Sequence, residues 1–217
     1  FLAFEGDTDT RIFLDGVEKP WTPGAWFVDE VIHKMKLGEL EAGIHELRVE
    51  MPFGNLTNLE WFYLLGKFGV TVSGDVCTLT KPQEQIGYGD VCSQGLPFYG
   101  GPLVYETEII VPKGTMEIEV GEYEGALTEV SIDDGEWKSV VFAPYTRVLG
   151  EVEAGTHTLR IRCYGTRINT FGQLHNCNPK ETYFGPTTWR TTGRNWCYTY
   201  RLHPWGILKA PVIRIYR

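Results

Sequence analysis

The chain has 217 residues, of which 42% are hydrophobic and 13% aromatic, and this composition predicts packed cores rather than disorder. The net charge of −8 argues against nucleic acid as a partner, because binding a phosphate backbone requires a clustered excess of Lys and Arg. No apolar run approaches the ~20 residues of a membrane span, and the first residues lack the basic and apolar regions of a signal peptide. Because the chain opens on Phe1, we expect an excised fragment of a longer protein.

The first third of the chain has the two-residue period of β-strands. A short strand over 12–14 runs into the turn dipeptide Asp15-Gly16, and residues 44–51 alternate between apolar and polar side chains. The long apolar run over 61–72 contains two glycines, as a buried strand with a bulge does. The strand pattern then lapses, which predicts a boundary near Thr80 and two units, 1–79 and 80–217.

The remainder of the chain continues as short strands separated by turns. Asp133-Asp134-Gly135-Glu136 predicts a tight hairpin turn, and no segment shows a helical stripe. With 25 Gly and 12 Pro spread between the strands, the pattern predicts an all-β fold of antiparallel sandwiches. Strands are expected over residues 105–111, 116–120, 129–132, 140–142, 146–149, 157–163, 196–202 and 212–216.

A twelve-residue motif occurs twice, as residues 38–49 and again as residues 150–161, at an offset of 112 (150 − 38). Each copy reads Gly-Glu-Leu/Val-Glu-Ala-Gly-X-His-X-Leu-Arg-Val/Ile and follows an Asp-Gly turn. The repetition predicts two related β-sandwiches in tandem. The first copy is expected to be incomplete, because few residues precede its motif. His45 and His157 recur within this strand motif, which favours a structural role over a catalytic or metal-binding one.

Five cysteines form an odd and sparse set, unlike the framework of a disulfide-stapled secreted module. Cys163 lies in an alternating strand on the same side as Leu159 and Ile161, so it is expected to be a small core residue. The other four flank loops and are candidates for one or two bridges that the sequence does not assign. They are Cys77, Cys92, Cys177 and Cys197.

The Ala-Gly-X-His-X-Leu-Arg strand entry resembles that of galactose-binding-like jelly rolls, the β-sandwich modules attached to many glycoside hydrolases. Residues 53–70 look like the closing strands of such sandwiches in large bacterial glycosidases, including α-L-rhamnosidase-like and family-two-like proteins. Residues 189–213 look like the terminal module of the same proteins. The resemblance implies an accessory β-sandwich, either carbohydrate-binding or architectural, appended to a catalytic domain that is not part of this chain.

Residues 165–204 form a long excursion rich in polar and aromatic side chains, and such loops on a compact sandwich are usually functional. Sugars are held by flat rings together with amide or charged groups, so this mixture predicts the ligand surface. A core or loop-packing role is the alternative for the aromatic residues, and for Tyr145 it is the favoured one. The predicted ligand-binding residues are His175, Asn176, Asn178, Trp189, Arg190, Arg194, Trp196 and Tyr145.

The sequence offers no established catalytic or metal motif. A zinc site from His175, Cys177, Cys163 and Cys197 fits no compact Cys/His spacing, so no cofactor is expected. A structural calcium ion is the remaining alternative, since hard oxygen ligands are abundant. Its candidate ligands are Glu106, Glu108, Glu122, Glu124, Asp133 and Asp134.

The sequence therefore predicts noncatalytic carbohydrate recognition within a bacterial glycoside-degrading protein, with a glycan and a catalytic domain as partners. The alternative is an architectural module that supports a catalytic domain without binding free sugar. A third hypothesis, a glycosidase site between the two units, requires paired carboxylates in a shared cleft. Open sheet edges of an incomplete first unit favour a homodimer, and a polysaccharide-degrading parent favours a secreted or cell-surface location.

Overall fold

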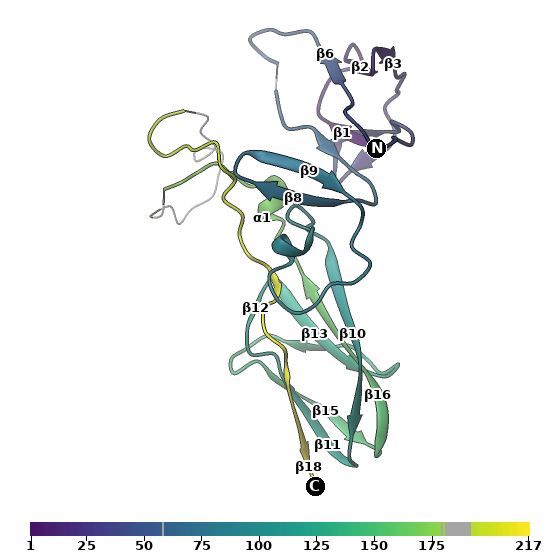
Figure 1. The fold of residues 1–217 in the computed structure, drawn as a ribbon, viewed down its shortest axis with the longest axis vertical. Coiled ribbons are helices and arrows are strands. Elements are labelled where there is room, and N and C mark those ends of the chain that lie inside the picture. Colours follow the sequence, from purple (N-terminus) through teal and green to yellow (C-terminus); the bar gives the residue numbers. More distant parts are fainter. Residues whose placement is uncertain (58, 179, 181–191) are drawn as a thin grey trace. The chain divides into compact units, whose positions relative to one another are not determined.

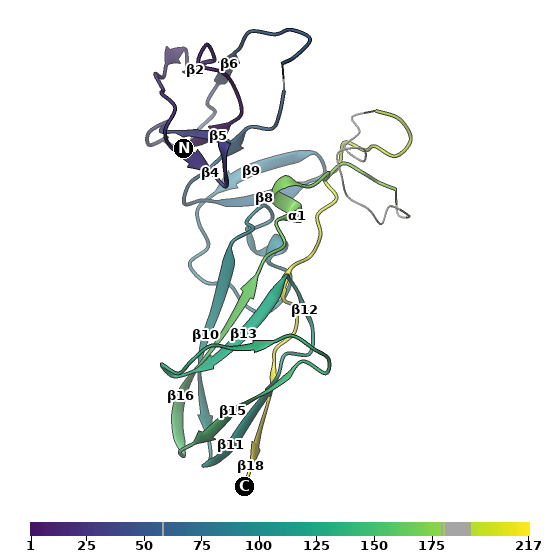
Figure 2. The ribbon, with the colours of Figure 1, turned by 180° about the vertical axis from the view of Figure 1, so that it is seen from behind.

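The computed structural model describes residues 1–57, 59–178, 180 and 192–217, and it confirms the all-β fold class (Figures 1 and 2). The only helical segments among these residues are the short 3₁₀ turn Val91–Gln94 and the single-turn helix α1 (Ile168–Phe171). Contacts divide the chain into two compact units, Phe1–Lys67 and Phe68–Arg217.

Unit 1 is a small sandwich of two antiparallel sheets. The sheet orders are β4-β5-β1-β7 and β3-β2-β6. Side chains from both sheets, among them Leu2, Phe4 and Ile12, which are fully buried, form one hydrophobic cluster. The strands are β1 (Leu2–Phe4), β2 (Arg11–Leu14), β3 (Val17–Glu18), β4 (Trp26–Phe27), β5 (Asp29–Met35), β6 (Leu47–Glu50) and β7 (Tyr63–Leu64).

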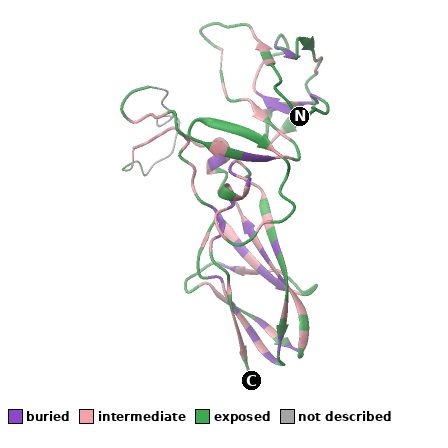
Figure 3. Cartoon of the chain, in the orientation of Figure 1, coloured by how far each residue is buried: buried purple, intermediate pink, exposed green. Residues whose placement is uncertain are grey.

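Unit 2 contains a larger sandwich with sheet orders β10-β16-β13-β14 and β15-β11-β18. Its strands are β10 (Pro102–Val111), β11 (Gly114–Glu119), β13 (Leu127–Ile132), β14 (Lys138–Val140), β15 (Thr146–Val152), β16 (Gly155–Tyr164) and β18 (Val212–Tyr216). Buried residues alternate along its strands, as the purple bands in Figure 3 show, because successive side chains of a strand point to opposite faces. Met116 and Ile118 of one sheet and Leu159 and Ile161 of the other belong to one core.

Two further pairs of strands complete unit 2. β12 (Tyr123–Glu124) pairs with β17 (Gly206–Ile207), and β8 (Gly69–Ser73) forms a hairpin with β9 (Val76–Thr80). The predicted boundary near Thr80 falls at the end of this hairpin, which the contacts assign to unit 2. The N–H of Val70 donates to the carbonyl of Gly95 (2.8 Å), and the N–H of Tyr200 donates to the carbonyl of Gly74 (3.0 Å).

The two units share the order and pairing of their strands. Leu14 of β2 lies opposite Leu47 of β6, as Ile132 of β13 lies opposite Leu159 of β16. In the other sheet β1 lies between β5 and β7, as β11 lies between β15 and β18. The strands β1, β2, β3, β5, β6 and β7 therefore correspond to β11, β13, β14, β15, β16 and β18. The internal duplication read from the sequence is a duplication of structure.

The repeated Asp and His residues make the same hydrogen bonds in both units. Nδ1 of His45 lies 2.7 Å from Oδ2 of Asp15, and Nδ1 of His157 lies 2.8 Å from Oδ2 of Asp133. In each copy, Nε2 of the His reaches the carbonyl four residues earlier (2.8 and 2.9 Å). The N–H that follows each His donates to Oδ1 of the same Asp, at 2.9 Å in both. The structural role predicted for the two histidines is confirmed, since each hydrogen-bonds the Asp of the preceding hairpin turn and so links that turn to the start of β6 or β16.

Candidate functional site

The polar-aromatic excursion over 165–204 connects β16 to the last strands of unit 2, and its two ends are tied together at α1. Asn169 is 4% exposed, and its Nδ2 donates to the carbonyl of His203 (2.8 Å). Oδ1 of Asn169 accepts a hydrogen bond from the N–H of His203 (2.9 Å). A single buried amide thus satisfies both backbone groups of His203, which closes the base of the excursion.

A second group, the partly buried carboxylate of Asp90, ties the 3₁₀ turn Val91–Gln94 to this base. Oδ1 of Asp90 accepts from the N–H of Cys92 (3.0 Å) and from the N–H of Trp205 (3.2 Å). Burial raises the pKa of the Cys92 thiol to about 12, so the thiol is held in its neutral form. The base of the excursion is a structural anchor built from neutral groups and one capping carboxylate.

Within the excursion, Asn176 and Trp196 form an antiparallel bridge. The N–H of Cys177 donates to the carbonyl of Asn195 (2.8 Å), and the N–H of Cys197 donates to the carbonyl of His175 (2.9 Å). These two bonds flank the bridge and fix Asn176 beside Trp196. Two predicted ligand residues that are twenty positions apart in the sequence are therefore neighbours (196 − 176).

Aromatic rings form a continuous row across this part of unit 2, which we call the aromatic row. Ring centroids lie 5.6 Å apart for Phe98 and Tyr200, and 4.6 Å apart for Tyr200 and His175. The row continues from His175 to Trp196 (5.6 Å) and ends with Trp196 and Tyr198, which meet edge to face at 4.4 Å and 78°. Tyr198 is 72% exposed, whereas Trp196 is partly buried. The row thus runs from a packed inner end to an exposed outer end.

Polar groups lie beside the outer end of the aromatic row. The backbone N–H of Asn178 donates to Oδ1 of Asn176 (2.9 Å), which fixes the side chain of Asn176 in a local turn. Nδ1 of His175 donates to the carbonyl of Cys197 (3.0 Å), which fixes the orientation of the imidazole ring. Arg194 is exposed, two residues before Trp196. Amide, imidazole and guanidinium groups therefore belong to the same segment as the rings.

The other predicted site residues have different placements. Trp189 and Arg190 lie outside the described residues. Tyr145 lies in the loop before β15, where its ring meets Tyr123 edge to face at 5.4 Å and packs against the hydrophobic core. Its N–H donates to the carbonyl of Phe142 (2.8 Å). Tyr145 has no ring contact with the aromatic row within the described part of the chain.

The strand predicted over 196–202 is wrong, because only Trp196 forms a bridge there. In place of a strand, the alternating residues make ring contacts: Trp196 meets Tyr198 edge to face, and Tyr200 packs against His175. Sequence reasoning therefore assigned Tyr198 and Tyr200 to a strand and overlooked them as part of the candidate surface. The signal that identifies them is the same spacing, taken together with the flanking amide residues.

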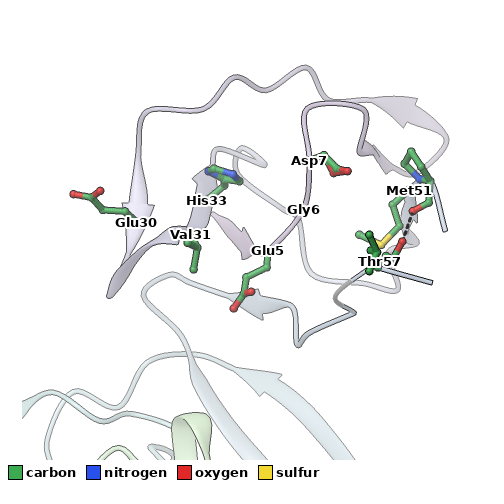
Figure 4. Close-up of a pocket in the computed structure, with 10 residues that line it drawn as sticks. Glu5, Gly6, Asp7, Glu30, Val31, His33, Met51 and Thr57 are labelled. Atoms are coloured by element: carbon green, nitrogen blue, oxygen red, sulfur yellow. Dashed lines mark hydrogen bonds between the residues drawn. The ribbon is translucent and has the colours of Figure 1, made fainter. Parts of the chain in front are cut away.

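Unit 1 contains a separate open pocket of about 450 Å³ that the sequence analysis did not anticipate (Figure 4). Acidic side chains and His33 line it together with apolar residues. The lining residues are Glu5, Gly6, Asp7, Glu30, Val31, His33, Met51, Pro52, Leu56 and Thr57. The ring of His33 packs 5.2 Å from that of Trp21, so it also belongs to the packing of the unit. The residues come from β5 and from several loops within the first 57 positions, so no local sequence motif indicates the pocket.

The described residues contain neither a candidate metal-binding cluster nor a disulfide bond. No three His, Cys, Asp or Glu side chains gather there in a way that would hold a metal ion. Four of the six carboxylates named for calcium make ion pairs: Glu106 with Arg160 (2.6 Å), Glu122 with Lys209, Asp133 with His157 (2.8 Å) and Asp134 with Arg160 (3.3 Å). All five cysteines are free thiols, and Cys163 is fully buried in the core as predicted. No helix formed by the described residues has the length and apolar character needed to span a membrane.

Comparisons of the chain with protein-family models, with curated proteins and with solved structures found no match.

Proposed function

We propose that unit 2 is a noncatalytic carbohydrate-binding module of a bacterial glycoside-degrading protein and binds a glycan at the outer end of the aromatic row. The observation that carries this proposal is the pair Trp196 and Tyr198, whose rings meet edge to face, together with the backbone bridge that makes Asn176 a neighbour of Trp196. The resemblance of the repeated motif to accessory modules of glycoside hydrolases points to the same class of ligand.

The chemistry of the outer end suits a sugar. The C–H face of a pyranose ring is apolar and stacks on an aromatic ring, while its hydroxyl groups require hydrogen-bond donors and acceptors nearby. Asn176 and Asn178 supply amide groups, and Arg194 supplies five donors. The ring of His175 packs against that of Trp196, and the ring of Tyr200 packs against His175. Because these contacts already restrict the side chain of Trp196, little of its conformational freedom is lost when a ligand binds.

The site is proposed to bind and not to hydrolyse. Glycoside hydrolysis generally needs two carboxyl groups about 5–10 Å apart across the scissile bond. Within the described ranges 172–178 and 192–200, which carry the outer end of the row, the sequence has no Asp or Glu. The residues there can stack on a sugar and hydrogen-bond to it, but they offer no acid and base pair.

An architectural function is the alternative, and the inner end of the row favours it. The N–H of Tyr200 donates to the carbonyl of Gly74 in the β8–β9 turn, and its ring packs against Phe98. These contacts fasten the excursion to the start of unit 2 whether or not a sugar binds. In that case the exposed ring of Tyr198 would support a neighbouring catalytic domain.

Affinity electrophoresis of the full chain in a panel of polysaccharide gels separates the two functions. We expect the wild type to be retarded by at least one glycan, and Trp196→Ala and Tyr198→Ala to lose about 2 kcal/mol of binding free energy, or roughly thirtyfold in affinity. Phe142→Ala is the matched control, because Phe142 is an 82% exposed aromatic residue outside the row. Absence of retardation on every glycan would leave the architectural function, and unchanged retardation of both row variants would exclude this site.

A further inference from the structure

The excursion over 165–204 is basic, although the chain as a whole is acidic. It contains five Lys and Arg residues and a single acidic residue, Glu181, so its net charge is +4 (5 − 1). Because the whole chain has a net charge of −8, all other residues together carry −12 (−8 − 4). The charges are therefore segregated, and the candidate sugar site lies on the basic segment. Its basic residues are Arg167, Lys180, Arg190, Arg194 and Arg201, of which Arg190 lies outside the described residues, as does Glu181.

Two successive turns connect Lys180 to the amide residues of the candidate site. Oδ1 of Asn176, the neighbour of Trp196 in the bridge, accepts from the backbone N–H of Asn178 (2.9 Å). Oδ1 of Asn178 in turn accepts from the backbone N–H of Lys180 (3.2 Å). These bonds between side chain and backbone lead the chain directly from the bridge to Lys180, which is exposed.

Arg194 lies on the facing segment of the same bridge. The N–H of Cys177 donates to the carbonyl of Asn195 (2.8 Å), and Sγ of Cys177 donates to the carbonyl of Arg194 (3.7 Å). Continuing this antiparallel register by one position places Arg194 opposite Asn178. Arg194 is exposed, as Lys180 is, so an exposed cation stands on each side of the bridge.

No carboxylate in the described part of the chain neutralises these two cations. Neither Lys180 nor Arg194 forms an ion pair there, whereas Arg160, Arg162 and Arg214 of the sandwich are each paired with a glutamate. The described ranges 172–178 and 192–200 also contain no Asp or Glu. Within this part of the molecule the charge of both cations is left for a ligand.

We propose that the glycan bound at the outer end of the aromatic row is anionic and pairs its carboxylate or sulfate groups with Lys180 and Arg194. A pyranose ring that stacks its C–H face on Trp196 or Tyr198 directs its substituents outward from the ring edge, where a charged side chain can meet them. A guanidinium binds such oxyanions through charge-assisted hydrogen bonds. This inference rests on the proposed carbohydrate function and names the class of its ligand.

Titration calorimetry of the full chain with two matched pairs of glycans tests the proposal. One pair is polygalacturonate and its methyl-esterified form, and the other is dextran sulfate and dextran. We expect tighter binding to the charged member of at least one pair, and the pair that shows the difference identifies the anionic group. Lys180→Gln and Arg194→Gln should each weaken this binding about fivefold, because each removes one exposed ion pair with the ligand. Neither variant should change binding to the uncharged member.

Arg147→Gln is the matched control for charge. Arg147 is an exposed residue of β15, outside the excursion, and it forms no ion pair with the described carboxylates. Its substitution removes the same unit of charge and should leave binding unchanged. An equal loss in Arg147→Gln and Arg194→Gln would mean nonspecific attraction to polyanions and would overturn the proposal.

Two further outcomes separate the proposal from the carbohydrate function on which it rests. Binding of the uncharged members that equals or exceeds that of the charged ones overturns the anionic preference and leaves the carbohydrate function in place. Binding to none of the four glycans also overturns the proposal, and the panel of polysaccharide gels then decides separately whether the chain binds another sugar.

Discussion

Arg11 of β2 and Glu129 of β13 occupy the same position in the two units and carry opposite charges. Arg11 lies opposite Glu50 in its sheet, and Glu129 lies opposite Arg162 in the other. Both positions form an ion pair with the residue opposite, at 3.3 Å in unit 1 and 3.1 Å in unit 2. The duplicated sheet has thus kept the cross-strand pair while exchanging its acidic and basic members.

The two ion pairs are expected to differ in their contribution to stability. The side chains of Arg162 and Glu129 are 27% and 16% exposed, and Arg162 also lies 3.8 Å from the ring centroid of Trp137. Those of Arg11 and Glu50 are 54% and 40% exposed, so solvent screens their attraction. We expect Glu129→Gln to destabilise unit 2 by about 1–2 kcal/mol and Glu50→Gln to destabilise unit 1 by about 0.5 kcal/mol or less. Calorimetric unfolding checks this, and equal losses would contradict it.

The pH dependence of stability should reflect the repeated Asp–His pairs. The hydrogen bond with Asp133 raises the pKa of His157 above 6.5, and the same bond lowers the pKa of Asp133 below 3.8. The His contribution is full below 6.5 and is lost as the pH rises through the raised pKa. The Asp contribution is full above 3.8 and is lost as the pH falls through the lowered pKa.

His157→Gln therefore gives a difference in Tm from the wild type that is largest between about pH 4 and pH 6 and shrinks above pH 7. His45→Gln repeats the experiment in unit 1, because the pKa of His45 is raised by its hydrogen bond with Asp15. Thermal unfolding over a pH series measures both differences. A difference that grows as the pH rises above 7 would contradict the assignment.

The period of two predicted strands reliably where a strand buries one face, and unreliably in the aromatic segment 196–202 and in the continuous apolar run 61–72. The strands predicted around Met116, Val130 and Ile161 are confirmed, because each has one buried face and so shows the alternation in its sequence. The single buried strand predicted over 61–72 is wrong. It is divided between β7 and β8, and Trp61 is 53% exposed. A continuous apolar run has no period that marks where a strand ends.

The candidate site was only partly predictable for a related reason. The composition of the excursion pointed to Asn176 and Trp196, but their adjacency depends on a bridge between segments twenty residues apart (196 − 176). The sequence also did not indicate that Arg11 and Glu129 occupy equivalent positions with opposite charges. This equivalence can be recognised only when the strands of the two units are aligned by their pairing. Contacts that depend on register between distant segments leave no local pattern in a sequence.

The cysteine thiols should differ in their rates of alkylation, according to burial and thiol pKa. Burial raises the pKa of Cys163 to about 11 and that of Cys92 to about 12, so the thiolate of each is scarce near neutral pH. Cys77 is exposed in β9. We expect iodoacetamide to label Cys77 first in the native protein and to leave Cys92 and Cys163 unlabelled until the chain is unfolded. Peptide mass spectrometry resolves the sites, and early labelling of Cys163 would contradict its place in the core.

Asn169 should be the position at which one substitution releases the excursion from the sandwich. Asn169→Ala removes the two hydrogen bonds between the buried amide and the N–H and C=O of His203, which costs about 1–3 kcal/mol. The matched control is Thr170→Val, which removes one hydrogen bond to the carbonyl of Phe98 and should cost about 1 kcal/mol. Since the aromatic row depends on the excursion being closed, Asn169→Ala should also speed amide exchange over residues 192–200, while Thr170→Val leaves it nearly unchanged. Exchange that is equally slow in both variants would show that the rings hold the excursion without this anchor.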